Sequence, residues 1–292
     1  MSRFTLLPGL RRVRLPSNRV QLGSDPERAF VLELPDDRFG SLLQRLESWH
    51  DESSFRVAAR GLGLTGTDAG DLLDLLQGQG FVLRSGDLTA DGSTAGKRPP
   101  LSREAWALAQ RRNRAPGPVL AQRGRQRVFV NGSGDLAEEV AALLRAAGFG
   151  RVWCCEESRR GNATLAVLVN CVQPASLAAR GHARLQLPHL PVSVLDGSVH
   201  IGPMVVPGVT PCLRCVDLHY RDRLPGWHTR GATDVLEATT AGLAAAWAAA
   251  VVQQQLDGED CAATAATIRI RPPLHIEHRD WDFHPSCGCR ER

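Results

Sequence analysis

Residues 1–88 carry apolar positions in an order that predicts a small α/β unit. Apolar runs flanked by turn residues such as Pro16-Ser17-Asn18 predict strands, and leucine or phenylalanine at every third or fourth position predicts helices. The predicted elements are strands at 13–15, 19–22, 29–34 and 81–84 and helices at about 36–48, 54–60 and 68–78. Thr67 is the expected cap of the third helix. Strands, three helices and a short strand are the order of a winged helix-turn-helix.

The pattern weakens between residues 90 and 125. Residues 91–100 are small, polar or proline, which is typical of a linker. Ser102, Glu104 and the alanine-rich stretch after them predict one helix to about Arg112, and Pro116-Gly117-Pro118 then breaks the chain. We therefore expect three parts: a winged-helix domain at 1–90, a linker with one helix at 91–125, and a second domain at 126–292.

From residue 126 onward, predicted strands alternate with predicted helices. The strands are 127–130, 151–155, 165–170, 190–195, 199–206, 268–270 and 274–278, and the helices are 136–147 and about 232–256. Asp196-Gly197 predicts a hairpin between two of these strands. A strand-helix-strand start indicates a doubly wound, mostly parallel, Rossmann-like α/β sheet.

The composition is that of an ordinary globular chain. Of 292 residues, 43% are hydrophobic and 23% are charged, which excludes a largely disordered protein. No apolar run reaches the roughly 18 residues of a membrane span, and the start of the chain lacks the pattern of a signal peptide. We expect a cytoplasmic protein without membrane contact, whose eight cysteines are reduced thiols or metal ligands.

The positive charge is almost entirely arginine. The net charge is only +4, and Lys97 is the single lysine. Six arginines fall between Glu104 and Asp135 with no acid among them: Arg111, Arg112, Arg114, Arg123, Arg125 and Arg127. They form either a solvated linker or a docking strip for an acidic partner.

Two close cysteine pairs predict a metal site. Cys212-x-x-Cys215 is expected in a loop just after a strand, and Cys287-x-Cys289 lies near the C-terminus. Two such pairs can converge into a tetrahedral thiolate site, for which zinc is suited. Four protein ligands leave no open position, so the zinc would be structural. Reduced surface thiols are the alternative, and His284 is a less natural replacement for one cysteine.

The turn Gly132-x-Gly134 lies between a predicted strand and helix, where a nucleotide phosphate can bind. Ala137 supplies a third small residue, but Asp135 places a negative charge beside the expected phosphate. Glu156 or Glu157 could bind the ribose. The alternative is a turn whose glycines serve tight packing.

These features together resemble the ThiF-like superfamily of ubiquitin-activating-type adenylyltransferases. The resemblance rests on 205–215 with its cysteine pair, on a long helix, and on the closing 284–289 with its second pair. The N-terminal part, with 23–29, is similar to the peptide-binding winged helix (the RiPP recognition element) of leader-peptide-binding ThiF-like cyclodehydratase partner proteins. Those proteins act in azole-modified peptide and bacteriocin biosynthesis. The resemblance implies the ThiF-like fold, structural zinc and a homodimer.

The chain departs from the active members it resembles. Only about nine residues, 156–164, separate two strands where ATP-binding residues are expected, with Arg159 and Arg160 as the only basic candidates. Asn170 stands where the family tends to carry a magnesium-binding aspartate, and asparagine is a poor magnesium ligand. We therefore expect a degenerate ThiF-like domain that has no catalytic residues and neither binds ATP nor adenylates.

The resemblance implies that the chain binds the leader of a ribosomally made precursor peptide and presents it to a YcaO-type cyclodehydratase. The leader would add a strand to the edge strand 29–34. The expected contacts are Phe30, Val31, Leu32, Leu72, Leu75 and Leu76, although the leucines also suit a core. One alternative is an ATP-dependent adenylyltransferase that activates a carboxylate. A winged-helix DNA-binding regulator is disfavoured, because the third helix carries Asp68, Asp71 and Asp74 and no basic residue.

Overall fold

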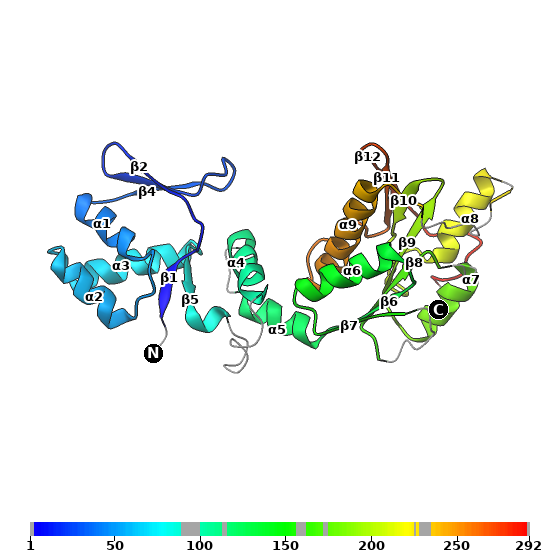
Figure 1. Cartoon of the computed structure of the whole chain (residues 1–292), viewed down its shortest axis with the longest axis horizontal. Coiled ribbons are helices and arrows are strands. Elements are labelled where there is room, and N and C mark those ends of the chain that lie inside the picture. The colour runs from blue at the N-terminus through cyan, green and yellow to red at the C-terminus, as the bar shows by residue number, and fades with distance from the viewer. Residues whose placement is uncertain are drawn as a thin grey trace. The chain divides into compact units, whose positions relative to one another are not determined.

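The computed structural model describes residues 3–88, 100–112, 116–155, 162–171, 175–224, 226–227 and 235–290. The chain forms two compact units, Met1–Ala121 and Gln122–Arg292 (Figure 1). The first unit is mixed α/β, and the second is built around one large sheet. The expected division at 90 and 125 stays a prediction.

The first unit contains two small sheets and a group of helices. Its elements are β1 (Phe4–Leu6), β2 (Arg12–Leu15), β3 (Arg19–Leu22), β4 (Phe30–Glu33), α1 (Asp37–Arg45), α2 (Glu52–Gly61), α3 (Gly66–Gly78), β5 (Val82–Arg84), a 3-10 turn (Ser85–Leu88), α4 (Pro100–Arg112) and the start of α5 (Gly117–Arg125). Strands β2, β3 and β4 form an antiparallel sheet in that order, and β1 pairs with β5. Leucine and phenylalanine side chains from both sheets and from α1–α3 share one core.

Local sequence signals explain most of these elements. Ser17 and Asn18 take positive φ values of 62° and 54°, which turns β2 tightly into β3. Helix α2 begins with a capping box between Asp51 and Ser54. The prediction that Thr67 caps α3 is wrong. Thr65 caps it, because Thr65 and Asp68 satisfy each other's backbone N–H groups in a second capping box.

Two elements of the first unit are absent from the prediction. Strand β1 is three residues long and pairs with the distant β5, so no local pattern marks it. The region 91–125 contains a second helix, α5, in addition to the predicted α4. Pro118 was interpreted as a break, but proline is tolerated in the first turn of a helix, where its missing N–H has no partner to lose.

The second unit is a seven-stranded sheet with helices on both faces. Its elements, after the end of α5, are β6 (Arg127–Asn131), α6 (Asp135–Ala146), β7 (Arg151–Cys155), β8 (Leu165–Val169), α7 (Ala175–Arg184), β9 (His189–Leu195), β10 (Ser198–Ile201), α8 (Leu213–Arg223), α9 (Ala238–Asp257), β11 (Ala266–Arg271) and β12 (His275–Asp280). The strand order is β12-β11-β10-β9-β8-β6-β7. Strands β7, β6, β8 and β9 are parallel, and two antiparallel steps through β10 give β11 the same direction. The predicted mostly parallel sheet is therefore confirmed.

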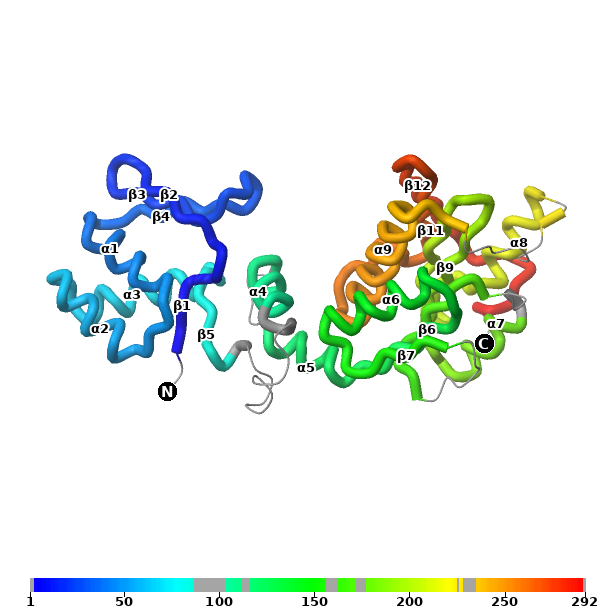
Figure 2. Tube along the Cα trace, in the orientation of Figure 1, coloured from blue at the N-terminus to red at the C-terminus, as the bar shows by residue number. Residues whose placement is uncertain are grey.

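Alternating side chains of the sheet divide its core into two layers. Val128 and Val167 lie in the layer that α6 and α9 cover, and Phe129 and Leu168 lie in the other layer with Leu213 of α8. Strand β8 is buried at every position, as expected for the centre of a sheet covered on both faces. Figure 2 shows α7, α8 and the C-terminal segment together at one side of this unit.

Helix α9 packs against α6 through small side chains. Ala244, Ala245 and Ala248 are fully buried, which allows the two helices to approach closely. Its predicted start at Ala232 lies outside the described residues. Within the described part of the chain, no helix combines the length and the hydropathy that crossing a bilayer requires.

The arginine-rich segment is not uniformly solvated. Arg123 is fully buried and forms a bidentate ion pair with Asp257, at 2.9 Å from Nε and 2.6 Å from Nη2. Its Nη1 donates to the carbonyl of Ala147 at 2.9 Å. For Arg123, both a solvated linker and a docking strip are therefore wrong. Arg111 and Arg125 are exposed, and Arg114 lies outside the described residues.

Candidate functional site

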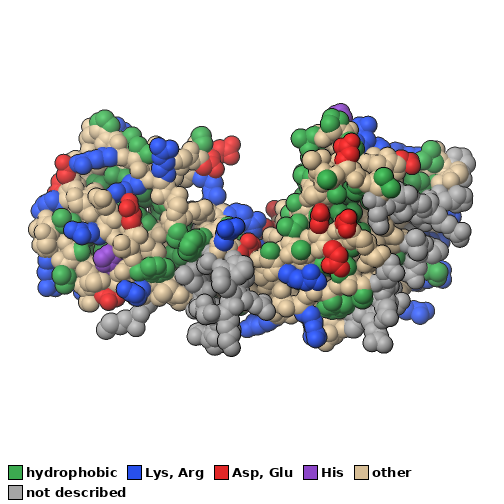
Figure 3. All heavy atoms as spheres, in the orientation of Figure 1, with side chains coloured by type: hydrophobic (Ala, Val, Ile, Leu, Met, Phe, Trp, Pro, Cys, Tyr) green, Lys and Arg blue, Asp and Glu red, His purple; other side chains and the backbone are tan. Residues whose placement is uncertain are grey.

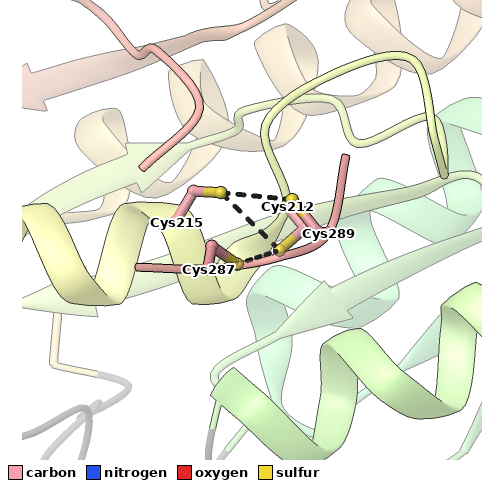
Figure 4. A group of neighbouring side chains, drawn as sticks. All are labelled: Cys212, Cys215, Cys287 and Cys289. Carbon is pink, nitrogen blue, oxygen red and sulfur yellow. Dashed lines mark hydrogen bonds between the residues drawn. The ribbon is translucent and has the colours of Figure 1, made fainter. Parts of the chain in front are cut away.

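The structure brings the four predicted cysteines together (Figure 4). The sulfur of Cys212 lies 3.5 Å from that of Cys287 and 3.9 Å from that of Cys215, and Cys215 lies 3.4 Å from Cys289. All four sulfurs are within 4.8 Å of one another. A regular tetrahedron with metal–sulfur bonds of about 2.3 Å has sulfur separations of about 3.8 Å. The four cysteines can therefore hold a metal ion.

Helix α8 positions the first pair. The prediction of a loop position holds for Cys212, which is the N-cap just before α8, and is wrong for Cys215, which lies in the first turn of α8. The preceding loop is held by Thr210, whose hydroxyl accepts from the Val206 N–H at 2.8 Å and donates to the Met204 carbonyl at 3.2 Å. Helix α8 was missed because its residues are mostly charged or polar and leave no clear apolar stripe.

His284 positions the second pair instead of joining it. Its Nδ1 accepts from the N–H of Ser286 at 3.1 Å, so its Nε2 carries the proton and donates to Asp222 at 2.9 Å. The carbonyl of His284 accepts from the N–H of Cys287 at 3.0 Å. His284 is not part of the four-sulfur group, and the sequence-based alternative of histidine ligation is wrong for this arrangement.

Hydrogen bonds and burial set the protonation of the cysteines. The hydrogen bond from Cys212 lowers the pKa of Cys215 to about 4 and raises the pKa of Cys212. Burial raises the pKa of Cys287 to about 11. Outside the cluster, burial and then Glu138 raise the pKa of the Cys154 thiol to about 11, which keeps it protonated and unreactive.

The Gly132-x-Gly134 turn follows the carboxyl end of β6. The next strand in the chain, β7, pairs on one side of β6, and β8 pairs on the other side, so the strand order reverses at this point. Such a reversal point is the usual ligand position of a doubly wound sheet. A side chain at Gly132 would meet the Val169 carbonyl at 2.7 Å, so the packing of β6 against β8 alone requires glycine there. Gly134 takes a φ of 85° and is the N-cap of α6. The first turn of α6 carries Asp135 and Glu138, and Figure 3 shows acidic side chains over the α6 and α9 face. These carboxylates repel phosphate.

Asn170 forms hydrogen bonds to the neighbouring strand β9. Its Oδ1 accepts from the N–H of Val194 at 2.9 Å, and its own N–H donates to the carbonyl of Val192 at 2.8 Å. It takes a left-handed conformation with a φ of 48°, which asparagine tolerates. Glu156, Glu157, Arg159 and Arg160 lie outside the described residues.

Strand β4 is an edge of the three-stranded sheet. The N–H of Leu34 donates to Asn18 at 2.9 Å, so alternation along the ladder directs the backbone groups of Leu32 toward β3 and those of Val31 and Glu33 outward. Val31 and Leu75 are 44% and 43% exposed, and Phe30 is half-buried. Leu32, Leu72 and Leu76 are core residues with at most 4% exposure, so they offer a ligand almost no surface.

A hollow of about 120 Å³ lies between the sheet and α8, and no sequence pattern predicted it. Ser193 and His200 are cross-strand partners on its floor, and Asp217, Tyr220 and Trp227 line its other side. Burial, followed by Arg269 and Arg279, lowers the pKa of His200 to about 4, so its imidazole is neutral at pH 7. The alternation of side chains along β9 and β10 could have predicted that Ser193 and His200 share one face of the sheet. It could not have predicted that α8 covers them.

The fold of the whole chain is similar to the folds of proteins of known structure. The first unit followed by the seven-stranded sheet gives the whole chain a fold that solved structures share. Comparison with sequence-family models gave no match, and no curated protein matched by sequence.

Three solved structures illustrate this similarity. E. coli MccB with ATP is 14% identical, with a TM-score of 0.66 over 98% of this chain and 99% of that one. The microcin C7 biosynthetic enzyme MccB with N-formylated MccA is 13% identical, with a TM-score of 0.66 over 99% of each chain. A heterocyclase with substrate and cofactor is 17% identical, with a TM-score of 0.71 over 99% of this chain and 39% of that one.

Proposed function

We propose that this protein is a non-catalytic scaffold of modified-peptide biosynthesis. In this proposal the first unit is a winged helix-turn-helix that binds the leader of a ribosomally made precursor peptide. The second unit is a degenerate ThiF-like domain, and the complex serves a separate YcaO-type cyclodehydratase. The observation that carries the proposal is the free edge of β4, with outward backbone groups at Val31 and Glu33.

The free edge of β4 has the chemistry for strand addition. An incoming strand would bond to the outward N–H and C=O groups of Val31 and Glu33, which supplies affinity without sequence selectivity. The exposed parts of Phe30, Val31 and Leu75 offer apolar contact for selectivity, while Leu32, Leu72 and Leu76 support the surface from the core. MccB solved with MccA, a precursor peptide, gives this proposal support from a similar fold.

The length of the solved heterocyclase supports a role for these residues beside a further cyclodehydratase part. This chain matches only 39% of it, so a further, larger part of that protein has no counterpart in these residues. We also propose a homodimer formed through the ThiF-like domain. Sedimentation at increasing concentration tests that part, since a monomer throughout would contradict it.

We further propose that the cysteine cluster holds a structural zinc ion. Cys212, Cys215, Cys287 and Cys289 fit four-thiolate coordination, with no ligand position left for substrate. Zinc bound there would join the C-terminal segment to the start of α8. The ion would contribute to folding and would take no part in a reaction.

A second candidate, an ATP-dependent adenylyltransferase, is favoured by the position of the Gly132-x-Gly134 turn and by the MccB structure with ATP. Asp135, Glu138 and the structural use of Asn170 oppose it. Phosphoryl chemistry depends on cations placed around the phosphates, and the described residues around this turn offer carboxylates instead.

A proline at Val31 tests the proposed function. The N–H of Val31 points away from β3, so Val31→Pro removes an outward donor and keeps the ladder between β3 and β4. Peptides selected for binding from a random display library are the probe, and Val31→Ala is the matched control. We expect Val31→Pro to weaken binding at least roughly tenfold, and Val31→Ala, which keeps the N–H and loses only part of an apolar contact, to weaken it clearly less. Unchanged affinity in folded Val31→Pro, or no selected peptide, would contradict the proposal.

A further inference from the structure

A second surface of the second unit, distinct from the Gly132-x-Gly134 turn, has the features of a binding groove. It is a hollow of about 470 Å³ between α7 and the cysteine cluster, and we name it the arginine groove. Its lining residues are Ala179, Arg180, Ala183, Arg184, Gln186, Pro207, Gly208, Cys212, Arg214, Cys287, Gly288 and Cys289. It is larger than the hollow under α8 and opens to the surface.

Among the residues that the structure describes, the lining is cationic and contains no acid. Arg180 and Arg184 are exposed and lie one helical turn apart on α7, and the half-buried Arg214 faces the same hollow from the first turn of α8. Among the described residues, no carboxylate pairs with any of these three guanidinium groups. Three uncompensated guanidinium groups around one hollow attract an anionic ligand.

The rest of the lining suits a polypeptide main chain. Ala179 and Ala183 present only methyl groups from α7, and Gly208 and Gly288 have no side chain at all. Leu177 is 54% exposed and lies three residues before Arg180, so the same face of α7 carries an apolar group beside the two arginines. An apolar contact next to paired cations is what a mixed acidic and apolar peptide requires.

The spacing of the arginines matches an extended strand. Side chains four residues apart on a helix have Cβ atoms about 6 Å apart. Alternate side chains of an extended strand are about 6.7 Å apart. Two acidic residues separated by one residue can therefore face Arg180 and Arg184 together, with an apolar residue near Leu177.

We propose that the arginine groove docks an acidic peptide segment of a partner protein, in which one residue separates two acidic residues and an apolar residue occupies the next alternate position. This inference is independent of the leader-binding proposal, since it uses none of its residues. Single-stranded nucleic acid fits less well, because none of the described lining residues is aromatic and they offer no ring on which a base can stack.

The cysteine cluster supplies one wall of the arginine groove. Cys212, Cys287 and Cys289 all face the hollow, and Arg214 lies between the two cysteines of α8. A metal ion bound to these sulfurs would hold that wall, and with it Arg214, at a fixed distance from α7. The groove is therefore tested on metal-loaded, full-length protein.

Fluorescence anisotropy with labelled pentapeptides tests the proposal. The probe is acetyl-Leu-Gly-Glu-Gly-Glu with a fluorescent C-terminal tag, so that the leucine and both glutamates share one face of the strand. Its control replaces both glutamates by glutamine. We expect saturable binding below about 1 mM for the acidic probe, weakening as salt rises from about 50 to about 300 mM. Arg180→Glu/Arg184→Glu should weaken binding at least roughly tenfold, while Arg184→Lys should weaken it less.

Matched variants separate the groove from the general charge of the protein. Arg151→Glu changes an exposed arginine of β7 outside the groove and should leave binding unchanged. Circular dichroism checks that each variant is folded, and the single Arg184→Ala variant replaces the double one if it is not. The proposal is overturned if the acidic probe fails to bind, if the glutamine probe binds equally well, if a uridine hexanucleotide binds more tightly than the peptide, or if folded groove variants bind like the parent.

Discussion

Arg123 and Asp257 form a buried ion pair in which each charged side chain is stabilised by the other. Both side chains are fully buried, and Arg123 also donates to the carbonyl of Ala147 and lies 5.5 Å from the ring centre of Phe149. Removing a charge from water is unfavourable, and paired hydrogen bonds offset that loss only while both partners are present. The pair joins the end of α5 to the end of α9.

Removing one partner of this pair should destabilise the protein strongly. Asp257→Ala leaves the guanidinium of Arg123 buried without its carboxylate, and we expect the free energy of unfolding to fall by about 3–5 kcal/mol. The double variant Arg123→Met/Asp257→Leu removes both charges and should lose much less. Urea unfolding of the three proteins measures this, and an equal loss in the single and double variants would contradict it.

Asp51, the N-cap of α2, should make the stability of the protein depend on pH in the acidic range. The hydrogen bond from the Ser54 N–H, with help from Ser53, lowers the pKa of Asp51 to about 2. The unfolded value is about 3.9, so the unfolded chain binds the proton more readily. Stability from the charged cap is therefore present above about pH 4 and is lost as the pH falls toward 2.

Melting temperatures of the parent and Asp51→Asn measure this contribution. The parent should melt higher at pH 7, and the difference should shrink between pH 4 and pH 2. A difference that stays constant over that range would show that the carboxylate charge is not responsible. Glu52→Gln, whose side chain pairs with Arg56 and does not cap the helix, is the control.

At the scale of elements, the sequence predicted those helices and strands whose formation depends on residues close together in the chain. The β2–β3 hairpin, α1 to α3 and the β6–α6–β7 unit follow from turns, caps and apolar spacing. Helix α7 was missed because it is short, contains Gly181 and lacks a long apolar stripe. Such a helix is stabilised by packing against residues that are distant in the chain, so the residues within it do not predict it.

The cysteine cluster was predictable because its two pairs are each local in sequence, although 75 residues separate Cys212 from Cys287. The arginine groove was not predictable, because its arginines come from α7 and α8, two helices that the sequence does not mark. The sequence also placed Leu32, Leu72 and Leu76 on a binding wall. Their spacing suits both a core and a surface, and only the packing assigns them to the core.

Loss of the second cysteine pair should release the metal and loosen α8. We expect Cys287→Ser/Cys289→Ser to lose most bound zinc and to melt about 10 °C lower, as a loss of roughly 3–4 kcal/mol implies for a domain of this size. Cys261→Ser is the control, since Cys261 lies outside the cluster and donates to the Val251 carbonyl. Metal analysis and thermal melting check this, and unchanged melting with unchanged metal content would exclude the cluster as the metal site.

At the scale of the whole molecule, the two units carry different chemistry. The first offers backbone groups and apolar surface at β4, and the second offers four cysteines that can hold a metal ion and a cationic groove. The turn where a doubly wound sheet commonly binds a nucleotide is explained by packing at Gly132 and by hydrogen bonding at Asn170. The proposed leader-binding scaffold accounts for this combination.

Calorimetric titration with magnesium ATP should therefore give no saturable heat at about millimolar nucleotide. The acidic first turn of α6 and the use of Asn170 in the sheet leave the described part of this site without groups suited to a triphosphate. Saturable binding in the micromolar range would favour the adenylyltransferase instead.

Amide hydrogen exchange at β4, with and without a selected peptide, tests the central claim most directly. In the free protein the N–H groups of Val31 and Glu33 point outward and should exchange fast, while Leu32 and Leu34 are protected by β3. Addition of the peptide should slow exchange at Val31 and Glu33 and leave Leu32 and Leu34 protected as before. Peptide binding without any added protection at Val31 and Glu33 would show that no strand is added to β4, and would contradict the account.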